Sequence, residues 1–139
     1  MSRSQIPATL RHFVYQRAKG KCEYCLIHED DTPFTHHIDH IIPIRHNGQT
    51  IRENLALACP ECNWNKGTDL TTFDPLKDEI TLLFNPRNQA WNEHFRLENA
   101  RIIGITPVGR ATEFLLRLND PARITERRAL SAVGRYPKT

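Results

Sequence analysis

The sequence has no long apolar run, no internal repeat and no low-complexity segment. A transmembrane helix takes roughly 18 or more consecutive apolar residues, and no run here approaches that length. The opening residues, MSRSQIPATLRHF, lack the apolar stretch of a secretion signal. We therefore expect a cytoplasmic protein that does not bind a membrane. Its 139 residues suffice for one domain.

Cysteine is also scarce, but the cysteines that are present follow a pattern. They form two Cys-x-x-Cys pairs. A reducing compartment disfavours structural disulfides, whereas four thiolates in two pairs match a closed tetrahedral zinc site. The gap between the pairs exceeds the about 15–20 residues of the commonest zinc-ribbon pattern. The competing interpretations are a redox pair and chance, but neither needs two pairs, and no thioredoxin-like βαβ pattern surrounds them. We predict structural zinc on Cys22, Cys25, Cys59 and Cys62.

Charge is distributed unevenly along the chain. Residues 1–21 carry five basic residues and no acidic ones, residues 22–93 carry five basic and twelve acidic, and residues 94–139 carry nine basic and four acidic. Lys and Arg neutralise phosphates and release counterions, so basic flanks around an acidic centre suit a nucleic-acid binder. The alternative is that these residues are ordinary solvated surface charge.

Apolar spacing predicts the elements of the first half. A helix is expected over residues 7–19, with Leu10, Phe13, Val14 and Ala18 on one face. Strands are expected over 36–43 and 55–59, with a connection that turns at Asn47-Gly48. The second cysteine knuckle should be followed by a helix after Cys62, which Gly67 would shorten. The centre of the chain therefore predicts two strands and a helix.

The second half is less strongly patterned. Strands are expected over 78–86 and 100–106, and pairing of the two would make a hairpin. Thr106-Pro107 and Asp120-Pro121 each provide an N-cap and a first helical residue. The last helix should end at Gly134, and we expect Arg123, Arg127 and Arg128 on its outward side.

Asp39 and His40 are adjacent in the first central strand. A carboxylate oxygen suits a hard cation such as Mg²⁺ or Mn²⁺, and a neutral histidine can accept a proton from water at neutral pH. Phosphodiester hydrolysis uses both groups. The dipeptide alone carries little information. However, Asn63 directly follows the last cysteine and offers a second oxygen ligand, and Lys66 lies on about the same helical face, where it could contact phosphate.

These motifs carry a resemblance to a known family. DHIIP, the glycine-bearing turn, NLALAC and CPECNxxKG resemble the HNH endonuclease family, in the zinc-knuckle branch of the ββα-metal nucleases. The likeness is close over residues 22–70. LFNPR, W-x-E-H-F and TPVGRA in the tail are similar to small bacterial HNH proteins. The resemblance implies an α+β fold with a ββα-metal core and zinc knuckles over residues 1–72. An N-terminal helix would precede this core. A C-terminal extension over 73–139, made of a β-hairpin and helices, would follow it and pack on the same domain.

The resemblance also implies roles for individual residues. Asp39 is similar to the metal-binding acid, His40 to the general base that activates water, and Asn54 to the central asparagine that orients the histidine. Asn63 is similar to the second ligand of the catalytic cation, which would be Mg²⁺ or Mn²⁺, with Ni²⁺ as a further candidate. The implied activity is cleavage of DNA, with double-stranded DNA as the expected substrate. No reader domain is apparent, so a homodimer or a specificity partner is one way to gain selectivity.

Several neighbouring residues allow two interpretations. His37 stands where relatives usually carry an acid. It shares a strand face with Asp39, so it is either a third ligand or a residue that contacts phosphate or packs beside the site. Arg45, His46 and Lys66 are candidate phosphate contacts, although a plain loop role suits His46 equally well. We expect Trp64 and Tyr24, which flank cysteines, to cover the zinc rather than stack on bases.

A non-catalytic, zinc-dependent nucleic-acid-binding module is the alternative function. Zinc knuckles and basic flanks would be enough for such a module. It would not need Asp39, His40 and Asn63 together, and all three are present here.

Overall fold

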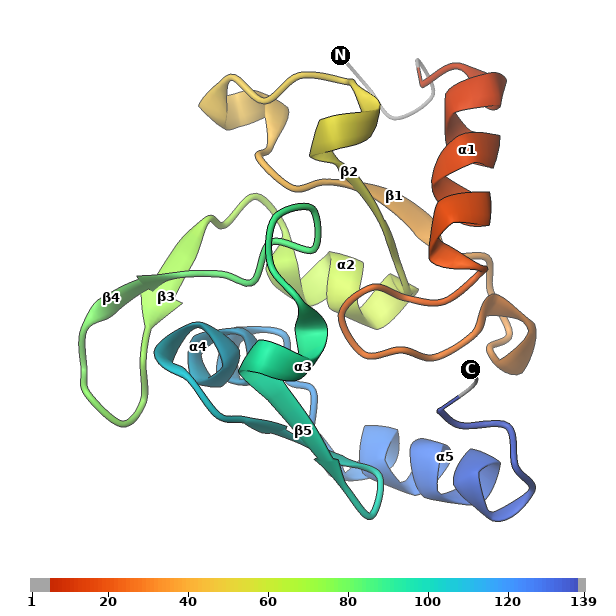
Figure 1. Ribbon diagram of the computed structural model, residues 1–139, viewed down its shortest axis with the longest axis vertical. Helices are drawn as coiled ribbons and strands as arrows, with labels where there is room; N and C mark the ends of the chain where they lie inside the picture. The colour runs from red at the N-terminus through yellow and green to blue at the C-terminus, as the bar shows by residue number, and fades with distance from the viewer. Residues whose placement is uncertain (1–5, 138–139) are drawn as a thin grey trace.

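Helices alternate with three two-stranded antiparallel sheets in the computed structural model, which describes residues 6–137 (Figure 1). This mixed composition confirms the predicted α+β class. None of the helices within residues 6–137 is long and apolar enough to cross a membrane. The elements in chain order are α1 (Ala8–Ala18), β1 (His37–His40), β2 (Leu55–Ala58), α2 (Pro60–Lys66), β3 (Thr71–Phe73), β4 (Ile80–Leu82), α3 (Trp91–His94), β5 (Phe95–Glu98), β6 (Arg101–Gly104), α4 (Pro107–Leu115) and α5 (Pro121–Ala132).

The centre of the chain forms a strand, a strand and a helix, as its pattern predicts. β1 and β2 pair antiparallel, with His37 opposite Ala58 and His40 opposite Leu55. Every residue of β2 is buried, which explains its continuous apolar run. α2 begins one residue after β2, with Cys59 as its N-cap, packs against both strands and ends at Lys66 with Gly67 as its C-cap. This arrangement places the end of β2, the start of α2 and the acidic residue of β1 close together.

The connection between β1 and β2 is closed by a side chain and a glycine. The Asn54 amide oxygen accepts a hydrogen bond from the Ile42 N–H at 2.8 Å. Its amide nitrogen donates to the carbonyls of Ile42 at 3.0 Å and Gln49 at 2.9 Å. A Cβ on Gly48 would lie 1.6 Å from the Ile42 carbonyl oxygen, so the backbone can approach this closely only at a glycine. The loop is therefore held in one shape next to the end of β1.

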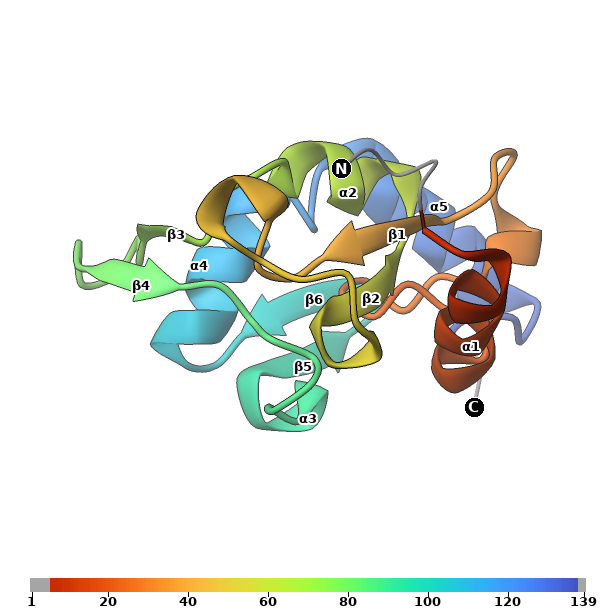
Figure 2. The same cartoon turned by 90° about the horizontal axis from the view of Figure 1, so that it is seen from above.

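α1 covers the β1–β2 pair from one side (Figure 2). Val14 is fully buried and belongs to a small core with Ile38, Leu55 and Leu57. Phe13 was expected on this buried face, but it is 36% exposed. Its ring instead packs beneath the guanidinium groups of Arg17 and Arg52, so it joins the helix to the β1–β2 connection.

The predicted hairpin between residues 78–86 and 100–106 is wrong. β4 pairs with β3, and β6 pairs with β5. Each strand finds its partner nearby in the sequence, because short turns make local pairing cheaper in chain entropy than a distant pairing. Asn99 and Ala100 both have positive φ, which allows β5 and β6 to be joined by a two-residue turn. The strand over 71–73 has one apolar residue in three, and the strand over 95–98 alternates apolar and polar residues over only four positions, so neither gives a strong signal.

The two halves of the chain share one hydrophobic core. Cys22 and Tyr24 from the first half belong to the same buried cluster as Phe84, Phe95 and Ile102 from the second. Phe84 and Phe95 meet edge to face, with ring centroids 5.3 Å apart. The extension therefore packs against the zinc-knuckle half over a continuous apolar surface.

The helical extension begins where the sequence predicts. The Thr106 hydroxyl accepts a hydrogen bond from the Gly109 N–H, so it caps α4 as expected. α5 begins at Pro121 and ends at Ala132, two residues before Gly134. Asp120 is the N-cap residue of α5, but its side chain makes no capping hydrogen bond there.

The prediction that Arg123 and Arg127 face outward is wrong, whereas Arg128 is exposed. The Arg127 guanidinium donates to the carbonyls of Ala100 at 2.8 Å and Leu118 at 2.7 Å. A long side chain can bury its methylene stem and place its charged end on backbone acceptors, so a helical arginine need not face solvent. These two arginines of the basic C-terminal flank are therefore buried and do not contribute to the basic surface.

Candidate metal centre and active site

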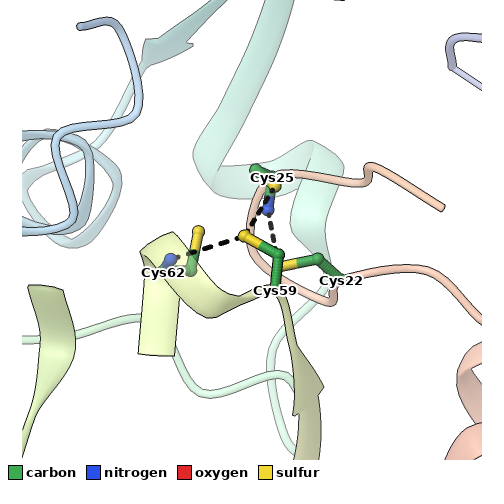
Figure 3. A group of neighbouring side chains, drawn as sticks. All are labelled: Cys22, Cys25, Cys59 and Cys62. Atoms are coloured by element: carbon green, nitrogen blue, oxygen red, sulfur yellow. Dashed lines mark hydrogen bonds between the residues drawn. The ribbon is translucent and has the colours of Figure 1, made fainter. Parts of the chain in front are cut away.

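The four cysteines meet at one point in the structure (Figure 3). All four side chains are buried, none is in a disulfide, and their sulfur atoms lie within 4.8 Å of one another. A tetrahedral zinc ion with Zn–S bonds of about 2.3 Å separates its sulfurs by about 3.8 Å. The Cys25 and Cys59 sulfurs are 3.6 Å apart. The geometry and the donor chemistry of these four residues therefore fit zinc.

In each cysteine pair, a backbone N–H donates a hydrogen bond to the sulfur of the first cysteine. The Cys25 N–H donates to the Cys22 sulfur, and the Cys62 N–H donates to the Cys59 sulfur, each at 3.4 Å. Because the first pair follows α1 and the second spans the junction of β2 and α2, a zinc ion held by all four would join these segments. We expected Trp64 to cover this site, but its side chain is 84% exposed on α2.

Asp39 lies inside the protein with its charge compensated. Its side chain is buried, and one oxygen accepts a hydrogen bond of 2.7 Å from the Tyr24 hydroxyl. The other oxygen accepts one of 3.2 Å from the Lys66 ammonium. Burial and the neighbouring Asp39 carboxylate both raise the pKa of Tyr24 well above its usual value, so it donates as a neutral phenol. A carboxylate has about four lone-pair sites, so a single carboxylate can accept more than two contacts.

Lys66 was expected to contact a phosphate, but its side chain is buried inside the protein. Its side chain is only 2% exposed. Besides Asp39, the ammonium donates to the carbonyls of His40 and Ile41, each at 3.2 Å. All three contacts lie on β1 or directly after it, so the lysine fastens α2 to the end of that strand.

His40 follows Asp39 on β1 and is half-buried. Its Nε2 lies 2.9 Å from the Thr50 hydroxyl oxygen. In the tautomer in which Nε2–H donates to Thr50, the basic lone pair is on Nδ1. Gln49, the residue before Thr50, is held by Asn54. Asn54 thus positions the backbone that carries the contact to the histidine.

Asp39 and His40 open onto the same hollow in the surface. Arg45 lines it on one side, and Gly67 and Thr68, which follow α2, line it on another. His46 is exposed, and its Nε2 lies 3.2 Å from the Thr68 carbonyl oxygen. The structure therefore brings Asp39, His40, Arg45 and His46 to one region.

Asn63 and His37 are placed differently. Asn63 is buried on α2, one helical turn before Lys66, and α2 packs against β1. His37 borders a separate hollow that is also lined by Arg11 and His12 of α1. Within residues 6–137, the four cysteines form the only group of three or more His, Cys, Asp or Glu side chains close enough to hold a metal ion.

Three contacts at these sites were not predicted. Tyr24 was assigned to the zinc site, but its hydroxyl reaches Asp39. Thr50 had no assigned role, although its position four residues before Asn54 placed it in the loop that Asn54 was expected to organise. Arg123 reaches the cysteine cluster from α5, and nothing in the local sequence around it indicates this contact.

Comparison with known families identifies the central segment. Residues 22–69 match the sequence model of the HNH endonuclease family. The match begins at the first cysteine and extends three residues past α2, so it contains both cysteine pairs, β1 and β2. Neither the curated proteins nor the solved structures contain a match to the chain. This match over residues 22–69 confirms the resemblance to the HNH endonuclease family and links that segment to nuclease or other nucleic-acid chemistry.

Proposed function

We propose that this protein is a metal-dependent endonuclease that hydrolyses phosphodiester bonds of double-stranded DNA. One observation carries the proposal: Asp39 and His40 are adjacent on β1 and open onto one hollow within the segment that matches the HNH endonuclease family. This arrangement provides an oxygen ligand and a proton acceptor beside each other. Both are held by contacts to other elements rather than by their own strand alone.

His40 is the proposed general base. Thr50 holds Nε2, so Nδ1 accepts the proton from a water molecule in the hollow. The water oxygen then forms a bond to phosphorus, in line with the P–O3′ bond that breaks. The leaving 3′ oxygen takes up a proton from solvent, and the product has a 5′ phosphate and a 3′ hydroxyl. His40 returns its proton to solvent before the next cycle.

Asp39 and Asn63 are the proposed ligands of the catalytic cation. A carboxylate and an amide oxygen are hard donors, which suit Mg²⁺ or Mn²⁺ and also accept Ni²⁺. When bound, the cation supplies positive charge that stabilises the pentacovalent transition state and the leaving oxygen. Tyr24 and Lys66 hold the Asp39 carboxylate at the edge of the hollow. His37 borders a different hollow, so we propose that it packs beside the site rather than acting as a third ligand.

The surface around the hollow is proposed to contact the DNA backbone. Arg45 and His46 are exposed next to it, in the connection between β1 and β2. Trp64 projects from α2 with most of its ring in solvent. An exposed aromatic ring can stack on an unpaired base, and nearby cations neutralise phosphates. Zinc on the four cysteines would have a purely structural role.

The Lys66 contact favours a second candidate function, a zinc-dependent nucleic-acid-binding module without catalysis. An ammonium group already lies 3.2 Å from Asp39, and its positive charge opposes the approach of a divalent cation. In such a module the cysteine cluster would support a binding surface, and His40 would have no chemical task.

A plasmid-nicking assay separates the two candidates. Zinc-loaded protein is incubated with supercoiled plasmid in Mg²⁺, Mn²⁺ or Ni²⁺, and in parallel with EDTA added just before the DNA. The nuclease proposal expects relaxed or linear product in at least one cation, none with EDTA, and a 5′ phosphate at the cut. Retarded migration of the plasmid without any cut in all three cations would refute the nuclease proposal and support the binding module.

A further inference from the structure

Arg123 of α5 lies against the cysteine cluster although it is 61 residues beyond the last cysteine. Its Nη2 donates to the Cys62 sulfur at 3.0 Å and is 3.6 Å from the Cys59 sulfur. Its Nη1 donates to the Leu116 carbonyl at 2.8 Å and the Arg117 carbonyl at 3.2 Å. The side chain is only 4% exposed. The guanidinium is therefore fixed by acceptors on two sides.

The charges at this point explain why a cation is buried here. Four thiolates around one Zn²⁺ ion carry a net charge of about −2, which is costly to bury without compensation. A guanidinium is always protonated and donates through several N–H groups in a fixed plane. Glu61 is the nearest carboxylate to Arg123, at 3.6 Å from Nε, but its side chain is 57% exposed. The buried partners of Arg123 are thus the two sulfurs and the two carbonyls.

A second contact joins the same cluster to the end of the chain. The Tyr136 hydroxyl donates to the Cys25 carbonyl at 2.7 Å, and its side chain is buried. Together, Arg123 and Tyr136 connect both knuckles to the C-terminal segment. The segment that matches the HNH family ends at residue 69, so neither residue lies within it.

We propose that Arg123 is a working part of the zinc site: it donates hydrogen bonds to the thiolates of Cys59 and Cys62 and makes zinc retention depend on the docking of α5. The inference rests on the assignment of zinc to the four cysteines. Residues that hydrogen-bond to metal ligands fix ligand orientation and offset ligand charge, and their loss typically weakens metal binding about 10- to 100-fold. By thermodynamic linkage, zinc should equally stabilise the docked position of α5.

The test measures zinc release rather than activity. Zinc-loaded full-length protein is mixed with excess 4-(2-pyridylazo)resorcinol at neutral pH, and the rate of release is followed by absorbance. We expect Arg123→Met to release zinc about 10- to 100-fold faster than the parent. The matched control is Arg128→Met, which removes an exposed arginine from the same helix and should stay within about 2-fold of the parent.

A second variant covers the case in which Arg123→Met does not fold, as judged by circular dichroism. Arg123→Lys keeps the positive charge, but its compact ammonium cannot reproduce the planar fork that meets both sulfurs and both carbonyls. We expect faster zinc release and, in Co²⁺-substituted protein, a sulfur-to-cobalt charge-transfer band shifted to longer wavelength, because the thiolates lose hydrogen-bond donors.

The outcomes are distinguishable. A folded Arg123→Met that matches the parent in release rate and cobalt spectrum would overturn the proposal, and so would an Arg123→Lys variant that matches it in both. A parent that purifies without zinc and binds neither Zn²⁺ nor Co²⁺ would overturn the zinc assignment itself. Neither result would bear on His40, because the nicking assay measures that proposal separately.

Discussion

Replacing Lys66 by methionine tests the buried ion pair that joins α2 to β1. Methionine has a similar length and fills the space of the lysine stem, so the main loss is the ammonium group. Its removal takes the ammonium away from the buried Asp39 carboxylate, which keeps the hydrogen bond from the Tyr24 hydroxyl, and removes a donor from the His40 and Ile41 carbonyls. Both side chains of the pair are at least 96% buried, since their exposed fractions are 2% and 4%, so solvent screens the pair very little.

Removing one member of such a pair typically costs about 3–5 kcal/mol, because the remaining charge is buried without compensation. We expect Lys66→Met to lower the free energy of unfolding of the zinc-loaded protein by this amount, measured by urea denaturation with circular dichroism. Lys77→Met removes an exposed lysine in the β3–β4 turn and should change it by less than about 0.5 kcal/mol.

A double-mutant cycle tests the cause of the loss. If the uncompensated Asp39 charge is responsible, Asp39→Asn combined with Lys66→Met should lose less stability than the sum of the two single variants, by about 0.5–3 kcal/mol. A loss below about 1 kcal/mol for Lys66→Met, or strict additivity in the cycle, would refute the reasoning.

Two further predictions concern the ion pair between Asp74 and Arg110 and the contact between Thr50 and His40. The hydrogen bonds from Arg110 lower the pKa of Asp74 from 3.8 to about 2, so this pair stabilises the fold above about pH 4 and the stabilisation disappears as the pH falls through 2. The difference in melting temperature between the parent and Asp74→Asn should therefore be constant from pH 7 to about pH 4 and shrink below it; a difference that grows on acidification would contradict this. If Thr50 orients His40, Thr50→Val should lower kcat for nicking about 10-fold with little change in KM, whereas Thr50→Ser should keep most activity. Equal losses in Thr50→Val and Thr50→Ser would argue against an orienting hydroxyl.

The sequence predicted the parts of the fold that depend on local pattern. The two cysteine pairs predicted a buried four-sulfur cluster, and the apolar runs predicted β1 and β2. A helix was expected after Cys62, but α2 begins two residues before it, at Pro60. Proline and capping residues predicted where α4 and α5 begin. These features follow from residue type and spacing over a few positions, so a single sequence contains the information.

The remaining features depend on distant contacts. A helical wheel places Arg123 and Lys66 on polar positions, and only the folded chain shows that Arg123 meets sulfur atoms and Lys66 meets Asp39. The pairing of β4 and β6 was misassigned because their partner strands, β3 and β5, have only three and four residues and give too short a pattern. Charge counting likewise overestimated the basic surface, since several arginines of the C-terminal flank bind groups inside the protein.

The nicking rate of His40→Ala tests the central claim most directly. Parent, His40→Ala and the control His12→Ala, which alters an exposed histidine on α1, are compared at equal zinc content in the cation that supports cleavage. General base catalysis contributes about 10²- to 10⁴-fold. We predict that His40→Ala loses at least about 100-fold in rate while its DNA binding and melting temperature stay close to those of the parent, and that His12→Ala cleaves normally. A His40→Ala protein that cleaves at the parental rate would contradict the assignment of His40 as the general base.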